Sequence, residues 1–511
     1  MTQGSVLEIK SYGAWNGGTP ADNSMYENKG MFFKGDIPVT LKTIEERIGI
    51  RTRMVAPDDV RIGTLALQNL LDTANIDPKQ IKMIVGATNV GDDKHDPGPL
   101  VRYPFDLIKD LCPEATPLDL YAGCPGYNVS VELLFILTLS GYLKQGDVSI
   151  VVGAENIHRA KAFVPLDTSN IIFGDDALAT ALETTATCVP SNGQIQIEKS
   201  RCSLSSDFIP ELAQAIVELN GDQKIDGIII DNQLGKLHYR VPATASRLQH
   251  ELAVRMFPEN FGDRRSKGFK SNLAFYNRHI DAFAYDIMTL SRSPQLLEDF
   301  ARAYIQSGKF ASIVSVYLRN DLTADITIQR GSGFNFKRPD RGIVDTRTRT
   351  HGCFADYIEA LPTEDDVFGN MNGKGVFLYA TRGAKEHISG LLQQNQLSIH
   401  DLDLLIEHQA NFAMIPMTLE KVLDNGQSDL KKDVVDYLSN KMITNIHTRG
   451  NCSVVCMQRL PYDLQRGKLA ADSIQGFPIN QNLEKLRAAK IILNDSVGAG
   501  MTRSSFLQIK K

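Results

Sequence analysis

A cysteine, a histidine and an asparagine, far apart in the chain, each occupy a turn beside a predicted strand or helix. They are Cys124, His408 and Asn451. This set of side chains performs acyl transfer in enzymes that form a covalent thioester. Cys124 would attack a thioester carbonyl, and neutral His408 and Asn451 would each donate a hydrogen bond to a developing enolate oxygen. The same donors would stabilise the carbanion equivalent that remains when a malonyl group loses carbon dioxide.

The turn that holds Cys124 lies between a predicted buried strand and a predicted apolar helix. Gly123 and Gly126 allow a tight turn, and Pro125 suits the first turn of a helix. The unpaired N–H groups and the dipole at a helix start favour negative charge, so we expect Cys124 to be a thiolate. The alternative is a small buried cysteine that only fills space.

A second set of donors is expected from the main chain. The N–H of Cys124 and an N–H of the glycine-rich turn at Gly498 and Ala499 would form an oxyanion hole for the thioester carbonyl. Each feature also has an ordinary alternative: His408 as a structural histidine, Asn451 as a helix N-cap, and the glycines as a plain turn. The occurrence of all of them at strand ends favours catalysis.

Predicted strands alternate with predicted helices on both sides of the middle of the chain. Buried, β-branched strands joined by helices indicate a parallel sheet covered on both faces, and therefore an α/β fold. Such sheets bind ligands just past the carboxyl ends of their strands, which is where the reactive turns lie. The predicted strands of this pattern are 82–88, 148–153, 402–407, 441–446 and 489–493.

The middle of the chain, residues 199–335, repeats features of the N-terminal part. We therefore predict a degenerate further copy of the strand–helix–strand unit there. Phe275 to His279 falls where Leu120 to Cys124 lies in the first copy, so the copy would carry no nucleophile. The alternative is a chance similarity between α/β units. The similar pairs of segments are 224–230 with 80–85, and 304–316 with 142–152.

Composition excludes several classes of protein. The 511 residues include 55 basic and 60 acidic side chains, and no long basic run suggests nucleic-acid binding. No apolar run reaches the ~18 residues of a membrane span, and the first residues lack a signal-peptide pattern. Seven scattered cysteines, an odd number, argue for a reducing cytoplasm. Cys452 and Cys456 have no second pair at metal spacing, so we expect no metal.

The chain resembles the β-ketoacyl-acyl-carrier-protein synthase III branch of the thiolase superfamily over about residues 36–185 and 365–511. The resemblance implies that Cys124 is acylated, that His408 and Asn451 activate the extender, and that Asn411 supports the site. It also implies an αβαβα layered fold of two pseudo-symmetric halves, working as a homodimer. The matching motifs, in the family's order, are Ala122–Gly126, Phe173–Asp175, Met371–Gly373, His408–Asn411, Gly450–Ser453 and Gly498–Gly500.

Several positions depart from the family pattern. Thr43 stands where relatives that accept coenzyme A esters often have a tryptophan. Arg503 stands where a large aromatic side chain is usual, and His95 lies in a polar loop where relatives often have apolar dimer-contact residues that shape the acyl pocket. We expect His95, Phe173 and Arg503 to contact substrate. These changes favour a specialised synthase of secondary lipid or polyketide metabolism.

The sequence thus predicts an α/β protein in three parts: an N-terminal thiolase-like half (1–198) with Cys124, an inserted α/β segment (199–335), and a C-terminal half (336–511) with His408 and Asn451. The expected reaction is a Claisen-type condensation of an acyl thioester with a malonyl- or β-ketoacyl-thioester. Coenzyme A or acyl carrier protein would carry these substrates, and no cofactor is expected. The alternatives are acyl transfer without decarboxylation, head-to-head condensation, or a weakly catalytic partner subunit of a synthase complex.

Overall fold

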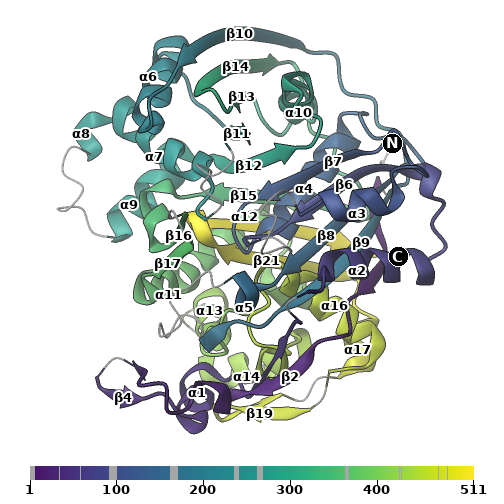
Figure 1. The fold of residues 1–511 in the computed structure, drawn as a ribbon, viewed down its shortest axis with the longest axis vertical. Helices are drawn as coiled ribbons and strands as arrows, with labels where there is room; N and C mark the ends of the chain where they lie inside the picture. Colours follow the sequence, from purple (N-terminus) through teal and green to yellow (C-terminus); the bar gives the residue numbers. More distant parts are fainter. Residues whose placement is uncertain are drawn as a thin grey trace.

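The chain folds around one ten-stranded and one four-stranded sheet (Figure 1). The computed structural model describes residues 6–33, 35–57, 59–90, 100–160, 171–234, 241–261, 269–362, 367–424, 426, 429–469, 471–479 and 482–510. The large sheet has the strand order β1-β9-β8-β6-β7-β12-β11-β13-β14-β10, so its second half comes from the middle of the chain. The α/β class expected from the sequence is confirmed.

The first five strands of the large sheet form the N-terminal part. Strand β6 pairs in parallel with β7 and β8, and β9 runs antiparallel between β8 and β1. Buried apolar side chains on both faces explain the continuous apolar character of β6 and β8. Their bounds are β1 Leu7–Ala14, β6 Ile81–Ala87, β7 Thr116–Tyr121, β8 Val148–Glu155 and β9 Asp176–Thr184.

The middle of the chain supplies the other five strands. They are β10 Gln194–Ser203, β11 Gly227–Asn232, β12 Phe283–Thr289, β13 Ser312–Leu318 and β14 Thr323–Ser332. Strand β10 pairs along its whole length with β14 and belongs to this unit. The predicted boundary between residues 198 and 199 therefore falls inside a strand, and the middle unit begins earlier than expected.

The C-terminal part forms the four-stranded sheet, in the order β15-β22-β21-β18. The bounds are β15 Gly342–Thr350, β18 Leu404–Glu407, β21 Ile491–Gly498 and β22 Thr502–Ile509. The strand predicted at 441–446 is wrong, since only a single bridge joins Met442 to Leu405. The Gln409 side chain forms hydrogen bonds with the backbone there in place of a neighbouring strand: it donates to Ile443 O at 2.8 Å and accepts from the Ile446 N–H at 3.1 Å.

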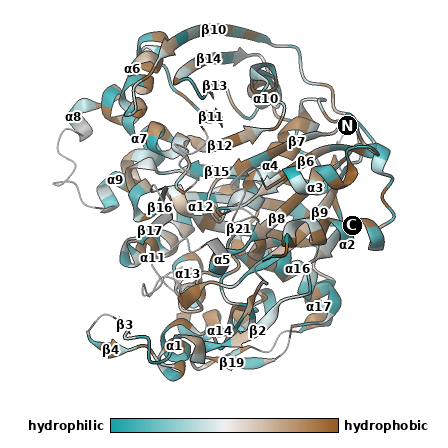
Figure 2. Cartoon of the chain, viewed as in Figure 1, coloured by the Kyte–Doolittle hydropathy of each residue, from teal (hydrophilic) through white to brown (hydrophobic). Residues whose placement is uncertain are grey.

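The helices complete five layers, αβαβα. Helix α4 (Gly126–Leu139) is buried at every position because it lies in the layer between the two sheets, where it contacts β8 and β22. Figure 2 shows hydrophobic residues along the inner strands and hydrophilic stretches on outer elements such as α6 and β10. No helix in the described ranges combines the length and apolar character that a bilayer span requires.

The other helices of the layers have the following bounds. Helix α16 (Cys456–Arg466) also lies in the central layer, and α10 (Pro294–Gln306) packs on the large sheet beside α4. The outer layer on the large sheet contains α2 (Ile62–Thr73), α3 (Arg102–Ile108), α6 (Phe208–Asn220) and α7 (Thr244–Met256), and the outer layer on the small sheet contains α12 (Ala384–Gln394) and α13 (Met414–Leu423).

Candidate active site

The turn after β7 and the turn after β21 meet in the interior. Cys124 precedes α4, with Gly123 in the left-handed region at φ +70°. Gly123 needs this freedom and also the space, because a Cβ there would lie 2.6 Å from Ala499 N. Gly498 is packed in the same way against the Cys124 main chain. The N–H groups of Cys124 and Ala499 both approach the Cys124 sulfur, so the expected pair of main-chain donors lies together at the nucleophile.

His408 and Asn451 face the same apolar pocket as Cys124. Asn451 Oδ1 accepts from the Ser453 N–H at 2.8 Å, which leaves the Nδ2 group as the donor available to a ligand. His408 Nδ1 has no hydrogen-bond partner in the described part of the chain. The other wall residues include Val90, Ile157, Ile172, Phe173, Val241, Ile358, Met371, Val376, Ala410, Met414 and Val497.

Burial sets the charge state of both reactive side chains. It raises the pKa of the Cys124 thiol to about 11, although hydrogen bonds from the Ser453 hydroxyl and from main-chain N–H groups act in the opposite direction. The raised pKa favours a thiol near neutral pH, in contrast to the thiolate expected from the helix start. Burial lowers the pKa of His408 to about 4, so the imidazole is neutral near pH 7, as a hydrogen-bond donor to an enolate must be.

A polar chain behind the cysteine was not anticipated from the sequence. The Ser453 hydroxyl donates to Cys124 Sγ at 3.3 Å. Asn89 Nδ2 lies 2.8 Å from Ser453 Oγ and 2.6 Å from Glu155 Oε1, so it connects the two. Burial raises the pKa of Glu155 to about 7. The only sequence signal was an acidic residue at the end of an otherwise apolar strand.

Of the other residues expected at the site, some lie at the pocket and others do not. Phe173 lines the pocket and pairs with Asn451 through an isolated bridge. Asn411 Oδ1 accepts from the N–H of Met414, the first residue of α13, at 3.1 Å. Arg503 does not line the pocket: it is buried in an ion pair with Asp495, and its Nη1 donates to Ala380 O at 2.7 Å. The expectation that Arg503 contacts substrate is corrected, and His95 lies outside the described residues.

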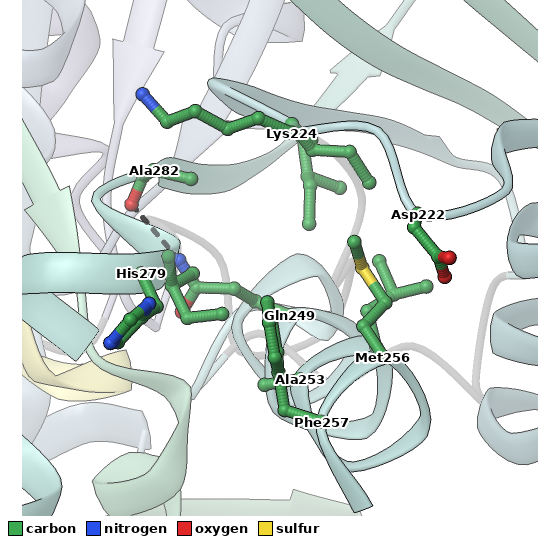
Figure 3. A pocket seen from close by; sticks show the side chains of 12 residues that line it. Asp222, Lys224, Gln249, Ala253, Met256, Phe257, His279 and Ala282 are labelled. Carbon is green, nitrogen blue, oxygen red and sulfur yellow. Dashed lines mark hydrogen bonds between the residues drawn. The ribbon is translucent and has the colours of Figure 1, made fainter. Parts of the chain in front are cut away.

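The sequence aligned Phe275–His279 of the middle unit with Leu120–Cys124, and the structure places that segment at a different point of the unit. Phe275 to His279 lies in helical segments directly before β12, whereas Cys124 follows β7, so the predicted match is wrong. His279 instead lines a separate cavity with Lys224, Gln249 and Ala282, at the amino ends of β11 and β12 (Figure 3). Gln249 Nε2 donates to Ala282 O at 2.9 Å beside this cavity. The residues that follow β12, at 290–293, include no cysteine.

The chemistry of the pocket is that of a thiol, a neutral imidazole and a carboxamide around main-chain donors. These groups are suited to form a thioester on Cys124 and to stabilise an oxyanion or enolate. In the described ranges, no three histidine, cysteine or acidic side chains are grouped as metal ligands would be.

Known proteins with similar sequences are condensing enzymes. A β-ketoacyl-[acyl-carrier-protein] synthase III of Rickettsia rickettsii is 25% identical over 274 residues, which cover 52% of this chain and 71% of the relative. The same enzyme of Helicobacter pylori is 22% identical over 247 residues, covering 44% and 66%. No protein-family model matches the chain.

Several solved structures have a similar fold. A 3-oxoacyl-[acyl-carrier-protein] synthase III of Aquifex aeolicus has a TM-score of 0.53 at 16% identity, covering 99% of this chain and 100% of that chain. An OleA variant of Xanthomonas campestris has a TM-score of 0.52 at 11% identity, covering 100% of both. At this identity the structures define the fold, which is the thiolase fold.

Proposed function

Because the chain is a β-ketoacyl-acyl-carrier-protein synthase III-like enzyme with the thiolase fold, we propose that it condenses an acyl thioester with a malonyl thioester through an acyl group on Cys124. One observation carries the proposal: Cys124, His408 and Asn451 face a single apolar pocket. An apolar wall beside a thiol suits a hydrocarbon acyl chain, and the main-chain N–H groups at the sulfur suit its carbonyl oxygen.

The first half-reaction moves the acyl group to the cysteine. Cys124 Sγ attacks the thioester carbonyl, and the N–H groups of Cys124 and Ala499 bind the oxyanion that forms. The bond from the carbonyl carbon to the donor sulfur then breaks. The proton of the Cys124 thiol leaves with the released coenzyme A or carrier thiol, so the products are acyl-Cys124 and a free thiol.

The second half-reaction extends the chain. A malonyl thioester loses carbon dioxide, and its enolate oxygen accepts hydrogen bonds from neutral His408 and from Asn451 Nδ2. The enolate carbon attacks acyl-Cys124, the carbon–sulfur bond breaks, and the β-ketoacyl thioester is released. One proton from solvent restores the Cys124 thiol. The residues supply all the required groups, so we assign no cofactor to the reaction.

The setting of the reaction follows from the same features. No disulfide joins the seven cysteines, which lie in the described part of the chain; this suits a reducing compartment, and we place the enzyme in the cytoplasm. The apolar wall around Val90, Ile157 and Met371 suits an acyl group larger than acetyl, as specialised lipid or polyketide synthesis would use.

Mass spectrometry of the intact protein tests the proposal. Incubation with a panel of acyl-coenzyme A esters should add one acyl mass to the wild type and none to Cys124→Ala. Absence of an adduct with every thioester would contradict the proposal. Release of carbon dioxide from a malonyl thioester should follow acylation. If acyl-Cys124 forms and is consumed without carbon dioxide release, the enzyme transfers acyl groups or condenses them head to head.

A further inference from the structure

The ten-stranded sheet consists of two units with the same topology. In chain order, β1, β6, β7, β8 and β9 occupy the same relative places as β10, β11, β12, β13 and β14. The directions also agree: β11 pairs in parallel with β12 and β13, and β14 is antiparallel to both β13 and β10. Helix α7 has the place of α3 and α10 has the place of α4, while α8 (Pro258–Phe261) and α9 (Phe269–Phe275) are additional in the middle unit. The middle unit is therefore a complete second copy of the N-terminal unit.

The two copies are related as two subunits of a symmetric dimer would be. Asp119 accepts from the main-chain N–H groups of Leu100 and Val101, and Asp286 accepts in the same way from Thr244 and Ala245, so the two aspartates are equivalent. Strands β7 and β12 pair antiparallel, with Asp119 opposite Met288 and Tyr121 opposite Asp286. Each aspartate thus faces the residue two places beyond its counterpart, which is the self-complementary pattern of a two-fold interface.

The second copy also reaches the active site of the first. Val241, which precedes α7, is buried, lines the pocket that contains Cys124, and packs against Ala499 and Ile358. Ser246, in the first turn of α7, packs against Gly500: a Cβ on Gly500 would lie 2.5 Å from the Ser246 hydroxyl oxygen. Arg247 forms an ion pair with Glu359, next to Ile358. The middle unit therefore forms part of the pocket wall and supports the turn that supplies the Ala499 N–H.

We propose that the middle unit is a built-in partner subunit that closes the acyl pocket, and that the Val241 side chain limits the acyl group the enzyme accepts. The inference rests on the proposed function, because it concerns the acyl site of that reaction. The edge of β7 is already paired with β12, so a second copy of the chain cannot pair there. The site is complete within one chain, and a homodimer, as expected from the family, would use another surface.

Acyl-chain selectivity tests this role of Val241. Loading of Cys124 is measured by mass spectrometry with straight-chain acyl-coenzyme A esters of increasing length. Val241→Phe should lower the loading rate of the longest accepted chain about tenfold or more relative to acetyl, and Val241→Ala should raise the rate for longer or branched chains. Val189→Phe makes the same change at a side chain that is 79% exposed and should keep the wild-type profile.

The outcomes separate the inference from the function on which it rests. If the wild type loads and both Val241 variants keep its length profile, the role of Val241 is wrong although the function stands. If none of the thioesters acylates Cys124 of the wild type, the proposed function is wrong and the inference with it. The loading rate per chain should also stay constant on dilution while sedimentation shows monomers. If loading were lost in parallel with dissociation of a dimer, the proposal that the middle unit acts as a built-in partner subunit would be wrong.

Discussion

Gly498 is packed directly against the main chain of Cys124. A Cβ at position 498 would lie 2.5 Å from Cys124 N and 2.7 Å from Cys124 Cβ. The Gly498 backbone is extended at φ −170°, so the position requires a glycine for space and not for conformation. The neighbouring atoms are Cys124 N, Cys124 Cβ and Pro125 Cδ, none of which can swing away as the end of a flexible side chain could.

We therefore expect Gly498→Ala to displace the nucleophile from the Ala499 N–H. A displacement of this kind lowers the rate about 100-fold. Acylation of Cys124, followed by mass spectrometry over time, measures the effect. Gly373→Ala is the matched control, since a Cβ there meets no atom within 4 Å. Equal acylation rates in the two variants would show that the contact has no role in positioning Cys124.

Alkylation of Cys124 should depend steeply on pH. With the thiol pKa raised to about 11, the thiolate fraction and the iodoacetamide rate should rise about tenfold per pH unit from neutral pH upward. Peptide mapping assigns the adduct, and Cys124→Ala removes it. A rate that is already at its plateau near pH 7 would show that Cys124 is a thiolate at that pH, as the helix start suggested, and would contradict the raised pKa.

The features that depend on local sequence patterns were predicted from the sequence. The turn at Cys124, the apolar α4 and the reactive turns at His408 and Ala499 follow from glycine, proline and strand signals. The charge state of Cys124 could not be predicted, because it depends on burial between two sheets. The same holds for Glu155 and for Val241, since only tertiary packing brings these residues to the pocket.

Two errors have a related cause. The similar apolar segments revealed the repeat. Its alignment around Cys124 was based on residue types, so His279 was matched with Cys124 although it lies before β12. The equivalence of Asp119 and Asp286 fixes the correct alignment, and it rests on hydrogen bonds that no motif reveals. Arg503 was expected to contact substrate because the sequence does not show that it pairs with Asp495, which lies on the neighbouring strand β21.

Glu155 should influence the pH dependence of acylation. Its pKa is raised to about 7, so the carboxyl is neutral below this pH and ionised above it. An ionised Glu155 strengthens the chain through Asn89 to Ser453, but also places negative charge near the sulfur and disfavours its thiolate. Glu155→Gln keeps an oxygen that accepts from Asn89 and removes the titration. We expect the wild-type rate profile to change slope near pH 7 and that of Glu155→Gln to be smooth there, and identical profiles would exclude an influence of Glu155.

The buried ion pair of Arg503 and Asp495 should matter for stability. Arg503→Ala leaves a buried carboxylate without its partner, which costs about 3–5 kcal/mol. Arg201→Ala breaks a pair with Asp325 in which the arginine side chain is 67% exposed, and should cost about 1 kcal/mol or less. Urea unfolding of the two variants measures the difference. Equal losses would show that the Arg503 pair is not the structural element proposed here.

Asn451→Asp separates the two half-reactions. The substitution keeps an Oδ1 that accepts from the Ser453 N–H, at 2.8 Å in the wild type, and replaces the Nδ2 donor by an acceptor. Loss of one such donor lowers the rate of the step it serves about 10²–10³-fold. Carbon dioxide release from a malonyl thioester should fall by this factor, while acylation of Cys124, which uses main-chain donors, should fall less, through the added negative charge in the pocket alone. Asn482→Asp makes the same change at the N-cap of a surface helix (Leu483–Arg487) and should alter neither rate. A parallel loss of both half-reactions in Asn451→Asp would mean that Asn451 shapes the pocket and does not act on the extender.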